Sequence, residues 1–123
     1  MSGWQPEYGP AALTEIPIAA LEVPSVIDEE KVMRYALMLD RMPPVVIFDI
    51  GGDLLVVDGY HRINAARRLG RPTVKAQVWR GTRDDALAFA AHTLAAERGI
   101  TVEAALRFIK WHMARMAERR PET

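Results

Sequence analysis

The residues best suited to chemistry in this chain follow one another in the segment Asp58–Arg62, which reads Asp-Gly-Tyr-His-Arg. A carboxylate, an imidazole and a guanidinium stand there around a glycine. The apolar run Leu54–Val57 before them predicts a β-strand, and Ile63–Leu69 after them predicts a helix that Gly70 ends. Free backbone amides and the positive end of the helix dipole make such a helix start a site for an anion. The segment therefore predicts an anion-binding turn between a strand and a helix.

Each residue type in this turn has a use in such a site. Gly59 lets a phosphate approach the backbone, and the amide of Tyr60 belongs to the same turn. Arg62 can add a bidentate guanidinium and His61 a further donor, which suits an oligophosphate. Asp58, at the strand end, suits a ribose hydroxyl or Mg²⁺. The turn favours a nucleotide, although a capping aspartate beside a surface His-Arg pair explains the same residues equally well.

Several short strands are expected to position the turn. The apolar runs Val45–Ile50 and Leu54–Val57, joined by Gly51–Asp53, predict a hairpin with both strands buried on two faces. The segment Pro72–Trp79 alternates apolar and polar residues and predicts a further strand of the same sheet. A proline within Ile16–Ile18 restricts any strand there to a short one or to a sheet edge.

Helices are expected around these strands. Asp28 is a good N-cap, and apolar residues recur at helical spacing from Val32 to Leu39 until the two prolines at 43 and 44 stop the helix. Residues 82–98 predict another helix, and an apolar stripe from Val102 to Met116 predicts a last one. A small mixed sheet with packed helices makes an α+β fold.

Length and composition restrict the class of protein. The 123 residues fit one compact domain and exclude a multidomain enzyme, and the lack of cysteine excludes disulfides and thiol nucleophiles. Without an apolar run of membrane-spanning length or a secretory leader, we expect a cytoplasmic protein with no membrane partner. Within the domain we expect an N-terminal arm at 1–13, a core at 14–80 and a C-terminal helical extension at 81–123.

Charge is distributed unevenly along the chain. Residues 1–58 carry three basic against ten acidic side chains, a net charge of −7, whereas residues 59–123 carry thirteen against six, a net charge of +7. A basic half favours an anionic partner. In its densest basic run, Arg67 is expected to extend the phosphate site, and Arg68 and Arg71 to contact nucleic acid. A solvated face remains the alternative for this run.

The segment Leu54–Gly70 resembles the signature of the ParB/sulfiredoxin superfamily, in which a strand leads into a Gly-x-[His/Arg]-Arg turn and an Ala-rich helix. The order of the other expected elements matches that fold over about residues 14–80. The resemblance implies a small mixed sheet with packed helices and two C-terminal helices. It also implies that Gly59, His61 and Arg62 cradle nucleotide phosphates.

Members of this superfamily differ at the position of Tyr60. Sulfiredoxins require a cysteine there, which excludes sulfiredoxin activity for this chain. ParB proteins usually carry glutamate there and bind CTP. The later Glu-Asn-x-x-Arg box of ParB lacks its asparagine here, while Ile100–Glu103 keeps the Ile-Thr-x-Glu helix start. We expect a stand-alone ParB-like domain that binds CTP or ATP and acts with DNA or a DNA-bound partner in plasmid partition or regulation.

Two other functions stay open. The ParB-like free serine kinase has a similar Asp-Gly-His-His-Arg turn and uses a carboxylate of an early helix as base. By this resemblance Glu30, or its neighbour Glu29, is the catalytic base of an ATP- or ADP-dependent kinase of a small metabolite such as free serine. Acidic residues in a first helical turn are also explained by the helix dipole. The other possibility is a degenerate fold that serves only for protein contacts.

The C-terminal helices suggest two kinds of partner. The turn around Gly99 resembles that of a helix-turn-helix, which would direct Arg107 and Lys110 toward DNA. The apolar stripe of the last helix predicts core or a dimer seam, so we expect a homodimer through these helices. His92 and His112 have no carboxylate at ligand spacing, and we expect no metal site made by the protein alone.

Overall fold

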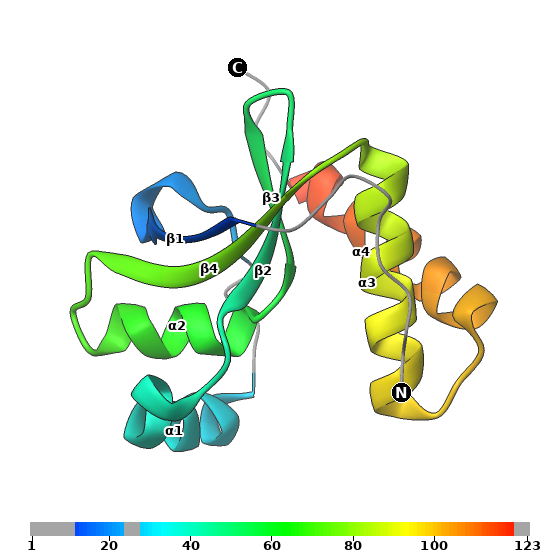
Figure 1. The fold of residues 1–123 in the computed structure, drawn as a ribbon. Helices are drawn as coiled ribbons and strands as arrows, with labels where there is room; N and C mark the ends of the chain where they lie inside the picture. Colours follow the sequence, from blue (N-terminus) through cyan, green and yellow to red (C-terminus); the bar gives the residue numbers. More distant parts are fainter. Residues whose placement is uncertain (1–11, 24–27, 120–123) are drawn as a thin grey trace. The chain divides into compact units, whose positions relative to one another are not determined.

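The computed structural model of the protein describes residues 12–23 and 28–119, which contain four strands and four α-helices (Figure 1). These residues form two compact units, the first of residues 12–23 and 28–82 and the second of residues 83–119. The expected α+β fold class is confirmed. None of the helices in these described ranges has the length and apolarity needed to cross a bilayer.

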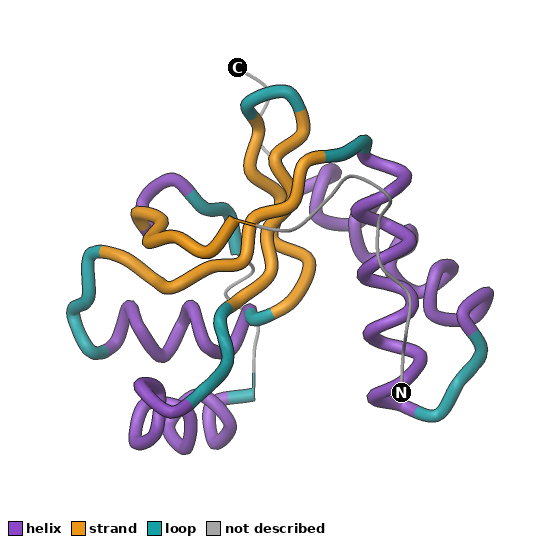
Figure 2. Tube along the Cα trace, viewed as in Figure 1, coloured by secondary structure: helices purple, strands orange, loops and turns teal. Residues whose placement is uncertain are grey.

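The first unit is built on a four-stranded mixed sheet (Figure 2). In chain order its strands are β1 (Ala12–Pro17), β2 (Val45–Ile50), β3 (Asp53–Asp58) and β4 (Thr73–Arg80). Across the sheet the order is β1-β4-β2-β3, with β2 and β4 parallel and the two outer pairs antiparallel. The predicted hairpin is β2 and β3, and β1 lies at an edge, as its proline requires.

Two α-helices belong to this unit: α1 (Glu29–Met38), which a 3₁₀ turn extends over Leu39–Arg41, and α2 (Tyr60–Arg68). The predicted N-cap of α1 is confirmed, because the Asp28 side chain accepts a hydrogen bond from the Lys31 amide at 3.2 Å. A further 3₁₀ turn, Ile18–Ala20, follows β1. Helix α2 contacts both α1 and the central strands β2 and β4.

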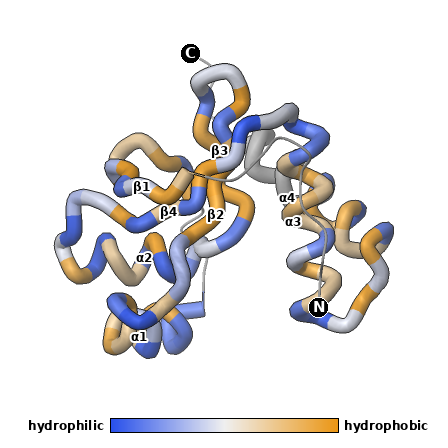
Figure 3. The backbone as a smooth tube through the Cα atoms, viewed as in Figure 1, coloured by the Kyte–Doolittle hydropathy of each residue, from blue (hydrophilic) through white to orange (hydrophobic). Residues whose placement is uncertain are grey.

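The core of this unit lies between α2 and one face of the sheet. Ile63 and Ala66 of α2 are completely buried against strand residues such as Val45 and Ile47. Strand β2 is hydrophobic along most of its length, as Figure 3 shows, and its first four residues are buried. Ile63 and Ala66 thus hold the middle of α2 against the sheet.

One expectation about burial differs from the structure, and α1 is largely exposed. Strand β3 is an edge strand in which only Val56 is fully buried, so it is not covered on two faces as predicted. In α1 only Val32 is buried, whereas Met33 and Leu37 point outward and are 62% and 90% exposed. A short apolar run cannot indicate which of its residues will find a neighbouring element.

The second unit is a pair of helices, α3 (Arg83–Arg98) and α4 (Val102–Arg119). Ala91, Ala95 and Ala105 are buried where the helices meet, and small residues there allow close approach. Leu106 and Ile109 of the predicted stripe pack against this cluster, while the side chains of His112, Met113 and Met116 lie outside the described residues. Of the predicted boundaries, the arm at 1–13 lies mostly outside the described residues, and the assignment of both helices to one domain stays a prediction.

Candidate functional site

The turn between β3 and α2 depends on a glycine. Gly59 is the N-cap of α2 and has φ +114°, a conformation that L-residues rarely adopt. A Cβ atom at this position would lie 2.5 Å from Cγ1 of Val45 and 2.7 Å from its Cβ. Both the conformation and the close approach of Val45 therefore require glycine at the start of α2, and no acidic residue follows in the first turn. Its amides and dipole suit an anion.

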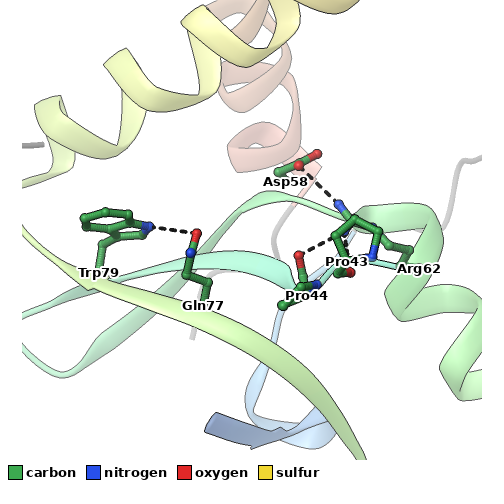
Figure 4. A network of polar contacts seen from close by, with 6 residues as sticks. All are labelled: Pro43, Pro44, Asp58, Arg62, Gln77 and Trp79. Carbon is green, nitrogen blue, oxygen red and sulfur yellow. Dashed lines mark hydrogen bonds and ion pairs between the residues drawn. The ribbon is translucent and has the colours of Figure 1, made fainter. Parts of the chain in front are cut away.

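Arg62 is the only charged residue that the described chain buries, at 8% exposure. Its Nη1 donates to the carbonyl oxygens of Pro43 and Pro44 at 2.7 and 2.9 Å, and its Nη2 donates to Oδ2 of Asp58 at 3.1 Å (Figure 4). A guanidinium can satisfy several acceptors in one plane. The side chain thus ties the segment before β2 to the end of β3 and the start of α2.

Tyr60 turns back toward the sheet. Its hydroxyl donates to the Val56 carbonyl at 3.1 Å, and its ring packs on the core of the unit. Burial raises the pKa of the Tyr60 hydroxyl above its ordinary value of 10.0, and the negative charge of Asp58 raises it further. The side chain is therefore neutral and structural, and only its backbone amide faces the helix start.

His61 links the start of α2 to the start of α1. Its Nε2 accepts the backbone N–H of Asp28 at 3.2 Å, and its ring meets the Tyr35 ring edge-on, with centroids 6.3 Å apart. A nitrogen that accepts a hydrogen bond carries no proton, so the proton of the neutral imidazole resides on Nδ1. The contact brings the first turn of α1, with the exposed Glu30, beside the first turn of α2.

The other predicted cations lie farther along α2 and after it. Arg67 donates to the Leu21 carbonyl at 3.5 Å, and Arg68 forms an exposed ion pair with Glu29. Arg71 pairs with Asp40 through both Nη atoms, and this hydrogen bond and charge hold the pKa of the Asp40 carboxyl below its ordinary value of 3.8. The structure therefore does not gather these residues at the Gly59 turn.

A cavity of about 320 Å³ opens next to the buried guanidinium of Arg62, between the segment before β2 and the start of β4. Apolar residues such as Ala66 and Val74 line it, with Arg71 and Lys75 among its charged residues.

On the opposite face of the sheet, Trp79 Nε1 donates to Gln77 Oε1 at 3.3 Å (Figure 4).

The described residues contain no cluster of three or more His, Asp or Glu side chains that would hold a metal ion by itself. Mg²⁺ in nucleotide sites is commonly held by one or two carboxylates together with the phosphates. Asp58 fits this requirement, because its side chain is 32% exposed and Arg62 bonds only one of its oxygens. Asp58 is therefore a carboxylate at this turn whose chemistry fits such an ion.

Comparison with known proteins identifies the fold. No family model matches the chain. Among solved structures, a Pnob8-like ParB N-domain superposes with a TM-score of 0.60 at 16% identity, covering 87% of this chain and 48% of that one. ParB of Caulobacter crescentus, complexed with CTP-gamma-S, gives 0.56 at 19% identity over 73% of this chain and 54% of that one. The fold is ParB/sulfiredoxin-like. Sulfiredoxin from Arabidopsis thaliana gives 0.54 at 22% identity, covering 59% of this chain and 90% of that one.

The ParB/sulfiredoxin-like fold confirms the resemblance inferred from the β3–α2 segment. The chain spans about half the length of the ParB chains that it matches. Arg107 and Lys110, predicted to face DNA, are exposed on α4 of the second unit.

The roles of three residues at the turn, Pro43, Pro44 and Val45, could not be recognised from the sequence. Val45 closes the space beside Gly59, and the carbonyls before it receive the Arg62 bonds. The prolines at 43 and 44 were interpreted only as a helix stop. Two successive prolines cannot donate backbone hydrogen bonds but keep their carbonyl acceptors, which is a signal for a buried donor elsewhere in the chain.

Proposed function

We propose that the chain binds a nucleoside triphosphate, CTP or ATP with Mg²⁺, at the first turn of α2. The observation that carries this proposal is Gly59, which opens the helix at φ +114° where Val45 leaves no space for a Cβ atom. The turn thus presents backbone amides to an anion, with the helix dipole behind them. The Caulobacter ParB complexed with CTP-gamma-S shares the fold, which supports this ligand class.

The side chains around the turn have different roles in this proposal. His61 carries its proton on Nδ1 and is a phosphate donor, and Asp58 helps to hold Mg²⁺. Arg62 keeps the turn in shape through Pro43 and Pro44 and supplies positive charge beneath it. Arg67, farther along α2, adds to the positive potential of the same helix.

The proposed context is a stand-alone ParB-like domain that acts with DNA or a DNA-bound partner. Arg68 and Arg71 are exposed at the end of α2, and Arg107 and Lys110 are exposed on α4. Exposed cations give DNA affinity that falls steeply with salt. Loss of Arg107 and Lys110 should therefore weaken DNA retention in a gel and reduce its salt dependence, if these side chains contact phosphates.

Calorimetric titration with CTP, ATP, ADP and GTP, each with Mg²⁺, tests the site. Loss of one hydrogen bond to a charged phosphate lowers affinity about tenfold, so His61→Ala should show this loss for the nucleotide that binds. His92→Ala removes the same side chain from α3 and is the matched control. No heat of binding with any of the four nucleotides would refute the proposal and would favour a fold used for protein contacts.

A second candidate function is phosphoryl transfer from ATP or ADP to a small metabolite such as free serine. The contact between Asp28 and His61 favours it, because it brings the first turn of α1 beside the anion turn. Glu30, exposed in that turn, would accept the proton of an attacking hydroxyl. Glu30→Gln should abolish turnover and leave nucleotide binding intact, whereas the absence of turnover in the unchanged protein would exclude this function.

A further inference from the structure

The cavity beside Arg62 has an apolar interior. Its volume of about 320 Å³ lies between residues 39–43 and the first residues of β4. Val45, Ala66 and Val74, which are all buried, form its inner wall. At about 30 Å³ for each molecule of liquid water, this volume corresponds to about ten waters. A cavity of this size with an apolar wall suits a small organic molecule.

The cavity exists because β2 starts later than the neighbouring strand β4. Val45, the first residue of β2, pairs with Ala76, so residues 73–75 of β4 extend beyond the pairing. The two prolines before Val45 have no N–H to donate to that edge of β4, and their carbonyls accept from Arg62 instead. The ladder between β2 and β4 therefore cannot continue there, which leaves space along the start of β4.

The mouth of the cavity is charged. Arg71 and Asp40 are exposed there and pair with each other. The exposed carboxylate of Glu15 accepts a hydrogen bond from Thr73 Oγ1 at 2.8 Å. Lys75 is also exposed and makes no ion pair with any residue that the structure describes. Both carboxylates of the lining are thus bonded, while one of its cations is left without a partner.

We propose that this cavity binds a small organic carboxylate. The apolar body of the ligand lies against the inner wall, and its carboxylate lies at the mouth beside the ammonium of Lys75, where it keeps part of its hydration. A single unpaired ammonium suits a single negative charge, and the guanidinium of Arg62 adds positive potential from within. An organic cation would have to compete with Arg71 for Asp40 and would be repelled by Lys75.

This site is separate from the anion turn of the proposed nucleotide site. Arg62 lines the cavity, but Gly59, Tyr60 and His61 do not belong to its lining. Binding of a carboxylate therefore needs no nucleotide. The inference goes beyond the proposed function, and it can hold even where no nucleotide binds.

NMR titration of the full chain with 4-phenylbutyrate, a carboxylate with an apolar chain and ring, tests the site. We expect shifts of the backbone amides of Met42, Val74 and Lys75, which line the cavity, and weaker binding of the neutral 4-phenylbutan-1-ol. No shift of these amides, or shifts confined to Gly59 and the two residues after it, would overturn the proposal. Equal affinity for the alcohol would also overturn it, because the ammonium would then play no part.

Two variants test the ammonium and the cavity separately. Lys75→Met should raise the dissociation constant for 4-phenylbutyrate about two- to fivefold, the range of an exposed ion pair, and should leave the affinity for the alcohol unchanged. Lys110→Met removes an exposed lysine from α4 and is the matched control. Met42→Trp narrows the cavity with a larger side chain and should weaken the binding of both probes. Unchanged affinity for 4-phenylbutyrate in Lys75→Met, which alters only an exposed side chain, would overturn the proposal.

Discussion

The two ends of α2 use the same residue types in different ways. At its start, Gly59 is packed against Val45, and the Arg62 guanidinium is buried among three acceptors. After its end, Gly70 also has a positive φ, of +72°, but nothing lies within 4 Å of its Cβ position. Arg71 there is exposed and pairs with Asp40 in solvent.

The difference shows that surroundings, and not residue type, determine what a glycine or an arginine contributes. A buried guanidinium that loses its partners leaves polar groups unsatisfied, whereas an exposed pair exchanges its bonds with water. A glycine that packs against a neighbouring strand is required because a side chain would clash and because its φ is positive. A glycine with free space around it is required only because its φ is positive. The start of α2 should therefore be far more sensitive to substitution than its end.

The largest effect is expected for Arg62→Ala. It leaves the carbonyls of Pro43 and Pro44 and the partly exposed Asp58 carboxylate without their donor, and each buried acceptor left unsatisfied costs about 1–3 kcal/mol of unfolding free energy. Urea denaturation measures this loss. Arg67→Ala, on the same helix but exposed, is the control. A loss for Arg62→Ala as small as that of the control would contradict the buried role.

A smaller but still large effect is expected for Gly59→Ala. The new Cβ would meet Val45 at 2.5 Å and would occupy an unfavourable φ, which together cost about 2–4 kcal/mol of unfolding free energy. Thermal denaturation of Gly59→Ala and Gly70→Ala compares the two ends directly. Gly70→Ala is destabilised only by its unfavourable φ. Equal losses of unfolding free energy in the two variants would therefore show that the contact with Val45 does not matter.

Tyr60→Phe should have a moderate effect, about 1 kcal/mol, through loss of the hydrogen bond to the Val56 carbonyl. The raised pKa of Tyr60 also makes the free energy of unfolding depend on pH. The folded chain retains the phenol proton more tightly than the unfolded chain. The stabilisation that Tyr60 provides in this way is therefore complete below the unfolded pKa of 10.0 and is lost as pH rises through the folded pKa. Denaturation at neutral and alkaline pH should show this loss in the unchanged protein and a smaller one in Tyr60→Phe.

Arg71→Ala should have the smallest effect on stability, because its ion pair with Asp40 is exposed. Its consequence is electrostatic. Arg71 holds the pKa of Asp40 below 3.8, so the substitution should raise that pKa toward its ordinary value. NMR titration of the Asp40 side chain measures the change, with Arg68→Ala as the control. No movement of the Asp40 pKa would mean that the pair does not persist in solution.

The β3–α2 turn and most of the elements could be predicted from the sequence, because their signals are local. The cap at Asp28, the glycine between β2 and β3, and the start of the last helix at Thr101 involve bonds between residues only three positions apart. The segment Leu54–Gly70 carried the resemblance to the ParB/sulfiredoxin-like fold for the same reason. Such features need no knowledge of the rest of the chain.

What Arg62 does could not be predicted locally. Its sequence neighbours predict a phosphate ligand, which stays a prediction, whereas its carbonyl partners are 18 and 19 residues away and meet it only when β2 lies beside β3. The same holds for Gly59, since the neighbour that leaves no space for a side chain is Val45 on another strand.

Helix α1 shows the same limit. Its apolar residues specified a helix, because their spacing follows from the 3.6-residue turn. Which of them would be covered depended on where α2 packs, so that Val32 is buried while Leu37 faces solvent. Local spacing and capping chemistry are sufficient for the elements of this protein, whereas burial is a property of the assembled layers and is decided by contacts between distant segments.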